Sequence, residues 1–183
     1  MEVQEFDIKG PKLFTLKAHS DDRGFFCERF RVNIFNEEHQ LPNFVQDNFS
    51  RSAPKVLRGL HYQWDKPQGK LVTVLHGEIF DVAVDIRKNS PTFGQHISLT
   101  LKDSLPQWFW IPPGFAHGFC VIGEQTADVM YKVDNYWNGK GESGIVWNDV
   151  DLKINWPIQA PLLSSKDGQM QNFKNYAQEA KFL

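Results

Sequence analysis

The sequence has little cysteine, no long apolar run and almost no net charge, and each absence removes a class of protein. Its 183 residues include only Cys27 and Cys120, too few for a disulfide framework, which indicates reduced thiols in a cytosolic protein. No apolar run reaches the length of about 18 residues that spans a membrane. No apolar stretch follows a basic start, so we expect no signal peptide. The formal net charge of −2 gives no electrostatic basis for binding nucleic acid.

The sequence also lacks internal repeats, low-complexity tracts and any cluster of proline and glycine typical of a linker. We therefore expect one domain over residues 1–183. Aromatic residues make up 14% of the chain, with 15 Phe and 6 Trp, which favours a β-rich core or a pocket that stacks on flat ligands.

Short segments rich in β-branched and aromatic residues, bounded by turn residues, predict many strands and little helix. The expected strands are Phe25–Phe30, Phe44–Ser52, Leu57–Gln63, Lys70–His76, Glu78–Asp85, Gln95–Leu101, Gln107–Ile111, His117–Ile122 and Ala127–Val133. This pattern is typical of an all-β sandwich or small barrel, whose mouth gathers side chains around a ligand.

The segments between these strands predict two turns and two helices. His76–Glu78 and Lys102–Ser104 are expected to turn the chain between antiparallel strands. A short helix is predicted over Phe35–His39 with Asn33 as its cap, and a second one over Gln169–Phe182.

The most informative stretch is Val56–Gln63, followed by Gln68–Val72, because it places His61 and Lys70 within strands. Residues two apart on a strand face the same side, so Arg58 is expected to share a face with Leu60 and Tyr62, opposite His61. A histidine and a lysine on the inward side of a β-barrel indicate a polar site there.

Two of the six histidines lie in dense polar and aromatic motifs, namely His61 and His117. The Pro-x-Gly-x-x-His pattern that ends at His117 resembles the second motif of the cupin superfamily. Cupins usually hold a metal through a His-x-His pair, a Glu and this later His, but here Tyr62 and Gln63 follow His61. With one histidine in each motif we expect no metal site, so that side chains alone carry the chemistry.

An ordered set of motifs makes the resemblance more specific. They are Asp22–Glu28, Gln46–Ser50, Leu57–His61, Gln68–Val72, Phe80–Arg87, Ile111–Phe119, Tyr131–Lys132, Trp147–Asp149 and Ser165–Asp167. Together, over residues 6–168, they resemble the dTDP-4-dehydrorhamnose 3,5-epimerase family. That resemblance implies a cupin-like jelly roll with short peripheral helices, and leaves 169–183 as a helix or tail.

The resemblance also implies the reaction, which is epimerisation at C3 and C5 of dTDP-4-keto-6-deoxyglucose on the way to dTDP-L-rhamnose. The C4 carbonyl acidifies the hydrogens on C3 and C5. The enzyme must supply a base, a cation or hydrogen-bond donor at the C4 oxygen, and an acid on the other face of the ring. No metal or redox cofactor is required.

Four residues match the family's catalytic positions. His61 matches the base, and Asp167 the carboxylate that orients it. Lys70 matches the cation near the C4 oxygen, and Tyr131 the proton donor on the opposite face. Without the resemblance, the sequence favours Asp167 as a helix cap and Tyr131 as a core tyrosine, and Lys70 could be a strand lysine with its ammonium in solvent.

Further residues match substrate contacts of the family. Arg23 and Arg58 match arginines that bind the diphosphate, with Lys166 assisting. Trp137 falls where relatives usually carry a tyrosine that stacks on thymine, and an indole can stack as well. The remaining matches are Glu28, Gln46, Asn48, His117 and Glu142, with Phe26 and Phe119 as walls of the sugar pocket.

The resemblance implies a homodimer in which the N-terminal segment adds to the partner's sheet and helps to line its site. Three other functions stay open. A related enzyme that inverts only one carbon, or a related isomerase, would use the same base and acid. A metal-dependent cupin such as a dioxygenase is disfavoured by the missing His-x-His pair. A non-catalytic module that binds sugar nucleotides would need no base.

Overall fold

The computed structural model describes all 183 residues and consists mainly of short strands. The strands are β1 (Glu2–Glu5), β2 (Lys12–Thr15), β3 (His19–Asp21), β4 (Gly24–Phe26), β5 (Gln46–Ser52), β6 (Leu57–Gln63), β7 (Lys70–His76), β8 (Glu78–Asp85), β9 (His96–Lys102), β10 (Gln107–Ile111), β11 (Phe115–Val121), β12 (Ala127–Val133) and β13 (Glu142–Gly144). The three helices are η1 (Asn33–Glu38), η2 (Asp167–Gln169) and α1 (Phe173–Gln178).

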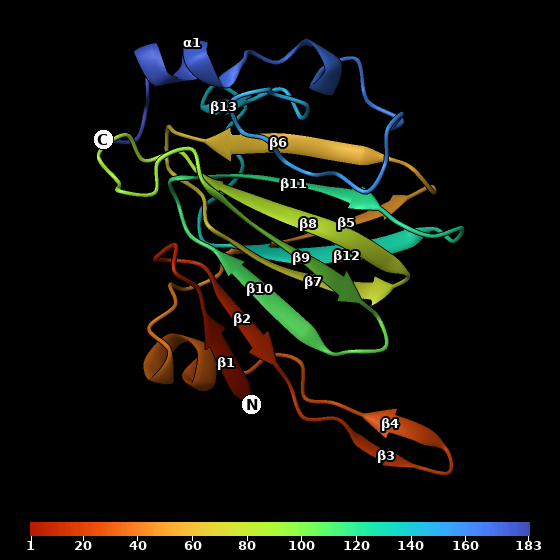
Figure 1. Ribbon diagram of the computed structural model, residues 1–183. Coiled ribbons are helices and arrows are strands. Elements are labelled where there is room, and N and C mark those ends of the chain that lie inside the picture. Colours follow the sequence, from red (N-terminus) through yellow and green to blue (C-terminus); the bar gives the residue numbers. More distant parts are fainter.

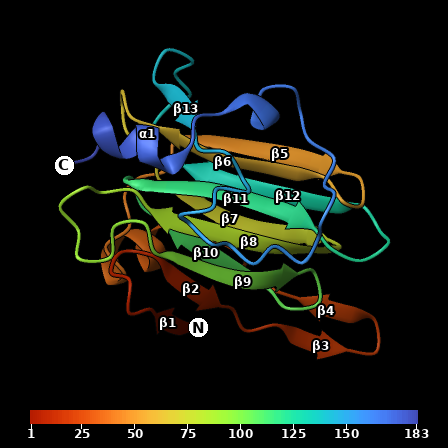
Figure 2. The ribbon, with the colours of Figure 1, turned by 45° about the horizontal axis from the view of Figure 1, so that its top comes forward.

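Two antiparallel sheets face each other (Figures 1 and 2). One has the strand order β1-β2-β10-β7-β12-β5, and the other has the order β13-β6-β11-β8-β9. Between them lies an apolar core in which side chains such as Val72 and Phe109 from the first sheet meet Ala83 and Phe119 from the second. The predicted all-β, cupin-like jelly roll with short peripheral helices is confirmed.

Each sheet is also covered on its outer face. The helix η1 places Phe35 against Trp108 and Trp110, on the outer side of the six-stranded sheet. The C-terminal tail with α1 covers the other sheet, where Tyr176 packs on Tyr62 with ring centroids 5.3 Å apart. Apolar burial of this kind contributes about 25 cal/mol per Å² and explains why such short helices persist.

The helix predictions were partly wrong. Asn33 lies inside η1 and is not its cap, because the helix begins at Asn33, two residues before the predicted start at Phe35. In the tail, Asn172 is extended and its side chain accepts a hydrogen bond from the backbone N–H of Asn175, so α1 can begin only after it. Gln171 and Phe182 form isolated bridges to Ile145 and Arg87, just beyond the ends of β13 and β8, instead of continuing the helix.

The two predicted turns do not join paired strands. His76–Glu78 connects β7 of one sheet to β8 of the other, and Lys102–Ser104 likewise connects β9 to β10. Gly77 makes the first corner with φ of 77°, and a Cβ there would meet the carbonyl oxygen of Thr126. Turn chemistry predicts where the chain reverses, but not which sheet receives the next strand.

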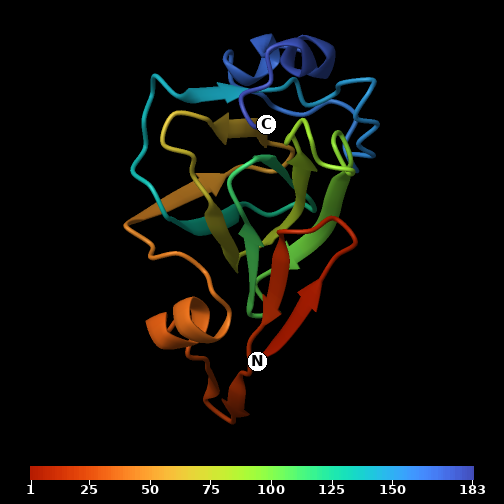
Figure 3. The ribbon, with the colours of Figure 1, turned by 90° about the vertical axis from the view of Figure 1, so that its left-hand side faces the viewer.

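The hairpin of β3 and β4 projects from the body at the end opposite α1 (Figures 1 and 3). Its side chains pack on little, since Phe25 is 62% exposed and Phe26 71%. The predicted strand from Phe25 is too long, and β1, β2, β3 and β13 were not predicted. β1 and β3 bury no side chain, and β2 and β13 have only four and three residues, too few to give a clear apolar pattern.

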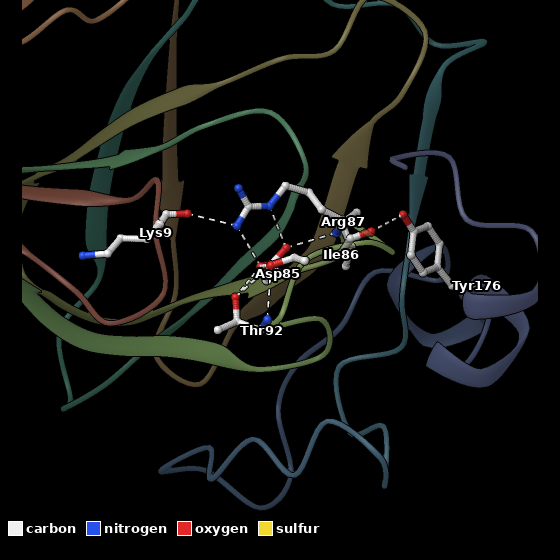
Figure 4. Close-up of polar contacts among 7 residues, drawn as sticks. Lys9, Asp85, Ile86, Arg87, Thr92 and Tyr176 are labelled. Atoms are coloured by element: carbon white, nitrogen blue, oxygen red, sulfur yellow. Dashed lines mark hydrogen bonds and ion pairs between the residues drawn. The ribbon is translucent and has the colours of Figure 1, made fainter.

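A buried carboxylate holds the loop that follows β8 (Figure 4). Asp85 is fully buried and accepts hydrogen bonds from the guanidinium and the backbone N–H of Arg87 and from the hydroxyls of Ser90 and Thr92. Burial alone raises the pKa of Asp85, but these donors outweigh it and hold the pKa below the ordinary value. Next to it, the hydroxyl of Tyr176 donates to the carbonyl of Ile86 at 2.7 Å and fixes the tail.

The substitution Asp85→Asn tests this arrangement. Asparagine keeps the shape but turns an acceptor into a donor that faces other donors, so we expect a loss of about 2–4 kcal/mol in the free energy of unfolding in urea at pH 7. Because the folded pKa lies below the unfolded one, the difference should shrink as the pH falls below the ordinary value of 3.8. The exposed Asp151→Asn is the control, and equal stability of both variants would contradict the role of Asp85.

Candidate functional site

A polar cavity of about 340 Å³ opens between the two sheets. It is lined by Gln46, Asn48, His61, Gln68, Lys70, Tyr131, Trp137 and Glu142. The six-stranded sheet supplies Asn48, Tyr131 and Lys70 from β5, β12 and β7, which are neighbouring strands. The five-stranded sheet supplies His61 and Glu142 from β6 and β13. The pairing of these strands therefore brings together residues far apart in the sequence.

His61 forms a short hydrogen bond with Asp167. The ring Nε2 lies 2.6 Å from Oδ1 of the carboxylate, which η2 brings from 106 residues away. Asp167 is only 4% exposed. Burial raises the pKa of Asp167, but His61, the hydroxyl of Ser164 and the charge of Lys166 together outweigh it and keep the pKa below the ordinary value. An ionised Asp167 accepts the hydrogen of Nε2, so Nδ1 keeps the lone pair that can take up a proton.

The strand that carries His61 is irregular just before it. The register between β6 and β11 shifts between Phe119 and His117, and Gly59 lies so close to β11 that a Cβ would meet Gly118 Cα at 2.5 Å. Strict alternation therefore fails, and the prediction that Arg58 shares a face with Leu60 and Tyr62 was wrong. Those two are buried under the tail, whereas Arg58 is exposed and donates to Ser52 Oγ at 3.0 Å.

Lys70 begins β7 and reaches into the cavity without a direct ion pair. Burial lowers the pKa of Lys70 to about 8, although the negative charges of Glu142 and Asp81 oppose the shift. At neutral pH the amine is therefore mostly protonated, and no carboxylate lies within ion-pair distance of it. A cation held in this way is available to stabilise a developing oxyanion.

Tyr131 lines the same cavity from β12. Burial raises its pKa, and Glu142 adds to the shift while Arg58 reduces it. The phenol therefore stays protonated at neutral pH and can donate a proton to a carbanion-like centre.

Four side chains form a hydrogen-bonded rim at the mouth of the cavity. The backbone N–H of Trp137 donates to Gln46 Oε1, and its indole N–H donates to Glu142 Oε2, both at 3.3 Å. The ammonium of Lys166 lies 2.7 Å from the same Glu142 oxygen. Burial raises the pKa of Glu142, but Lys166 and the indole outweigh it, so this carboxylate is ionised. The indole, 63% exposed, is free to stack on a ligand.

His117 and Phe119 lie behind the cavity and not on its wall. His117 is a direct neighbour of His61 across the strands, and its Nε2 contacts both oxygens of Asp81 at 2.9 and 3.0 Å. Burial lowers the pKa of His117 despite the opposing charge of Asp81. Phe119 belongs to the apolar core. Sequence analysis did not single out Asp81, although an acid in the apolar run of β8 is a signal that could have found it.

Three predicted substrate contacts lie away from this cavity in the same chain. Arg23 is at the tip of the projecting hairpin, where it pairs with Asp21 at 2.6 Å, and Phe26 ends that hairpin. Glu28 follows it and pairs with Arg31 at 3.4 Å. The predicted residues therefore divide into a group in and around the cavity and a group on or next to the hairpin.

Other reactive features are few. No group of three or more His, Cys, Asp or Glu side chains is placed to hold a metal ion. Burial raises the pKa of the Cys120 thiol to about 12, which makes it a poor nucleophile. None of the helices combines the length and the apolar character that crossing a membrane requires.

Comparison with known proteins agrees with this geometry. The family model described as dTDP-4-dehydrorhamnose 3,5-epimerase matches residues 5–175. The dTDP-4-dehydrorhamnose 3,5-epimerases of Pseudomonas aeruginosa and Shigella flexneri are 53% and 47% identical, each over 94% of this chain and 96% of the relative. The crystal structure of the 3,5-epimerase from Legionella pneumophila in complex with dTDP-4-keto-L-rhamnose superimposes with a TM-score of 0.90 at 46% identity, covering 93% of this chain and 92% of that one. The chain belongs to the dTDP-4-dehydrorhamnose 3,5-epimerase family.

Proposed function

We propose that this protein epimerises C3 and C5 of dTDP-4-dehydro-6-deoxy-D-glucose and forms dTDP-4-dehydro-L-rhamnose. The observation that carries the proposal is the gathering of a His61–Asp167 pair, an unpaired Lys70 ammonium and a protonated Tyr131 around one cavity. These groups are what carbon-acid chemistry next to a ketone requires. The names of the relatives at 47% and 53% identity support the same substrate.

In the proposed mechanism, Nδ1 of His61 removes the proton from the carbon next to the C4 carbonyl. The electron pair of the broken C–H bond moves into the ring and onto the C4 oxygen, which becomes an enolate. Lys70 stabilises the oxygen's negative charge, and Asp167 stabilises the imidazolium that forms. Both effects are strongest in a cavity that excludes water.

Reprotonation comes from the other face of the sugar. The phenol of Tyr131 gives its proton to the enolate carbon, the ketone re-forms, and the carbon is inverted. Solvent then returns the proton to the tyrosine and takes the one from His61. Repetition at the second carbon completes the double epimerisation, and no cofactor takes part in either cycle.

The rim of the cavity suits the nucleotide end of the substrate. We assign the thymine to the exposed face of Trp137, and the diphosphate to Arg58 and Lys166. Gln46, Asn48 and Glu142 are the further polar contacts, with His117 and Phe119 supporting the wall from behind.

We also propose that the chain works as a cytoplasmic homodimer of one domain over residues 1–183. The hairpin supports the dimer, since it extends away from the body of its own chain (Figure 3) and carries two exposed phenylalanines and Arg23. In the dimer, Arg23, Phe26 and Glu28 would complete the partner's cavity. An exposed apolar hairpin is normally covered, and a second copy provides the cover.

Deuterium incorporation tests the reaction directly. The wild-type protein is incubated with dTDP-4-dehydro-6-deoxy-D-glucose in D₂O, and the product is analysed by proton NMR. We expect deuterium at both C3 and C5, because each carbon exchanges its proton through groups open to solvent. Deuterium at one carbon only would replace the proposal with a single-centre epimerase, and no exchange would refute it.

The pH dependence tests Lys70. Since its pKa is about 8 and the charged form is the active one, kcat should fall as the pH rises through that value. Tyr131, whose pKa is raised, should not limit the rate there. The kcat of Lys70→Met should be about 100- to 1000-fold lower than that of the wild type at all pH values. Lys70→Arg should retain part of the kcat, and the fall in kcat at alkaline pH should move to higher pH, because arginine stays charged. If kcat of Lys70→Arg fell at the same alkaline pH as in the wild type, the role of Lys70 would be contradicted. Lys88→Met, at an exposed position, is the control.

Mixed dimers test the role of the hairpin. The protein should sediment at twice the 21.2 kDa of one chain. The variants Arg23→Ala and His61→Asn should each have reduced epimerase activity when assayed alone. For Arg23→Ala the reduction should appear at low substrate concentration. Subunits exchanged between the two variants should regain activity, because one of the two cavities then has both residues intact. No recovery on mixing would mean that Arg23 serves its own chain.

A further inference from the structure

We infer that Gln63 is a positioning residue that holds the Trp137 loop in place for the nucleotide, an inference that rests on the function proposed above. Gln63 is 5% exposed and lies on β6, two residues beyond His61. It does not line the cavity. Its side chain instead joins two loops beside the cavity, residues 64–69, which carry the lining residue Gln68, and residues 134–141, which carry Trp137.

The amide of Gln63 uses both its donor and its acceptor groups on the backbone. Its Nε2 donates to the carbonyls of Lys66 at 2.6 Å and Tyr136 at 3.1 Å. Its Oε1 accepts from the N–H of Asn138 at 2.8 Å. The last two partners are the residues on either side of Trp137, so one side chain fixes the backbone before and after the indole.

Neighbouring bonds join the same two loops. The N–H of Gly69 donates to Asp134 Oδ1 at 2.7 Å, and Asn138 Nδ2 donates to Asp65 Oδ2 at 2.8 Å. Lys66 itself has φ of 56°, a left-handed conformation that costs a non-glycine residue free energy. Gln63 binds the carbonyl of this strained residue from the buried side. Gln63 is therefore the anchor of the hydrogen bonds that join the two loops.

Trp137 needs such an anchor because the core does not hold it. Its side chain is exposed and its ring rests against Gly139, where a Cβ would meet the indole at 2.9 Å. If the loop moved freely, binding a nucleobase would have to order the indole first, and affinity would fall by that cost. Gln63 therefore acts on nucleotide affinity through Trp137, and not on the proton transfers at His61.

The test is the affinity for dTDP, measured by calorimetry, alongside kcat and KM. Gln63→Glu keeps the shape of the side chain but removes its two donor bonds. Gln63→Met removes all three hydrogen bonds without adding a charge. If one variant fails to fold, the other still tests the inference. We expect dTDP to bind about tenfold more weakly, as the loss of one net hydrogen bond would produce, and KM to rise with kcat within about twofold.

A double-mutant cycle with Trp137→Ala separates positioning from general loosening. If Gln63 acts through the indole, Gln63→Met should weaken dTDP binding by less than about twofold once the indole is gone. The control is Gln171→Met, a glutamine whose Nε2 donates to Tyr62 Oη at 3.1 Å on the other face of β6, and it should leave dTDP affinity unchanged.

Three results would overturn the inference. They are unchanged dTDP affinity in both Gln63 variants, equal weakening with and without Trp137, and a fall in kcat with KM unaltered. A wild-type protein that bound dTDP but incorporated no deuterium would refute the proposed function alone, and the affinity cycle would still decide the role of Gln63.

Discussion

The constraint on which the rest of the site depends is the cost of placing charge between two apolar sheets. A lone ionised group there would lose its hydration and shift its pKa until it became neutral. The protein meets this cost in different ways for different groups. Asp167 is stabilised by His61, and Glu142 by Lys166 and an indole. Lys70 receives no direct partner, and its pKa falls to about 8 as a result.

Because some ionisable groups have direct partners and Lys70 has none, side chains that lie close together can take different chemical roles. The carboxylates are kept ionised, the phenol of Tyr131 is kept protonated, and the lysine is left close to its titration point. Groups whose environments push their pKa values apart can serve as base partner, acid and electrostatic stabiliser at one pH. The sheets make this possible because β6 and β7, which belong to different layers, present His61 and Lys70 to the same cavity.

The sequence predicts the central strands well, because strands such as β7 and β12 have enough buried side chains to give a clear pattern. It misses β1 and β3, because these strands bury no side chain at all. The faces of β6 depend on a register shift opposite Gly59, which no alternation rule anticipates. The pairing of His61 with Asp167 came only from the family resemblance, because residues alone could not tell a helix cap from a partner 106 positions away. Gln63 was visible in the motif, but its role depends on loops whose courses the sequence does not specify.

The position of the C-terminal tail has a consequence for how the chain is made. Tyr176, at the centre of α1, packs into the apolar cluster on the outer face of the five-stranded sheet. Phe182, farther along the tail, bridges to Arg87. During synthesis the five-stranded sheet precedes these residues, so its outer face stays open to water and to other chains until the tail has emerged. Docking of the tail therefore completes this part of the fold, and the interval before it docks is when a new chain is most prone to aggregate.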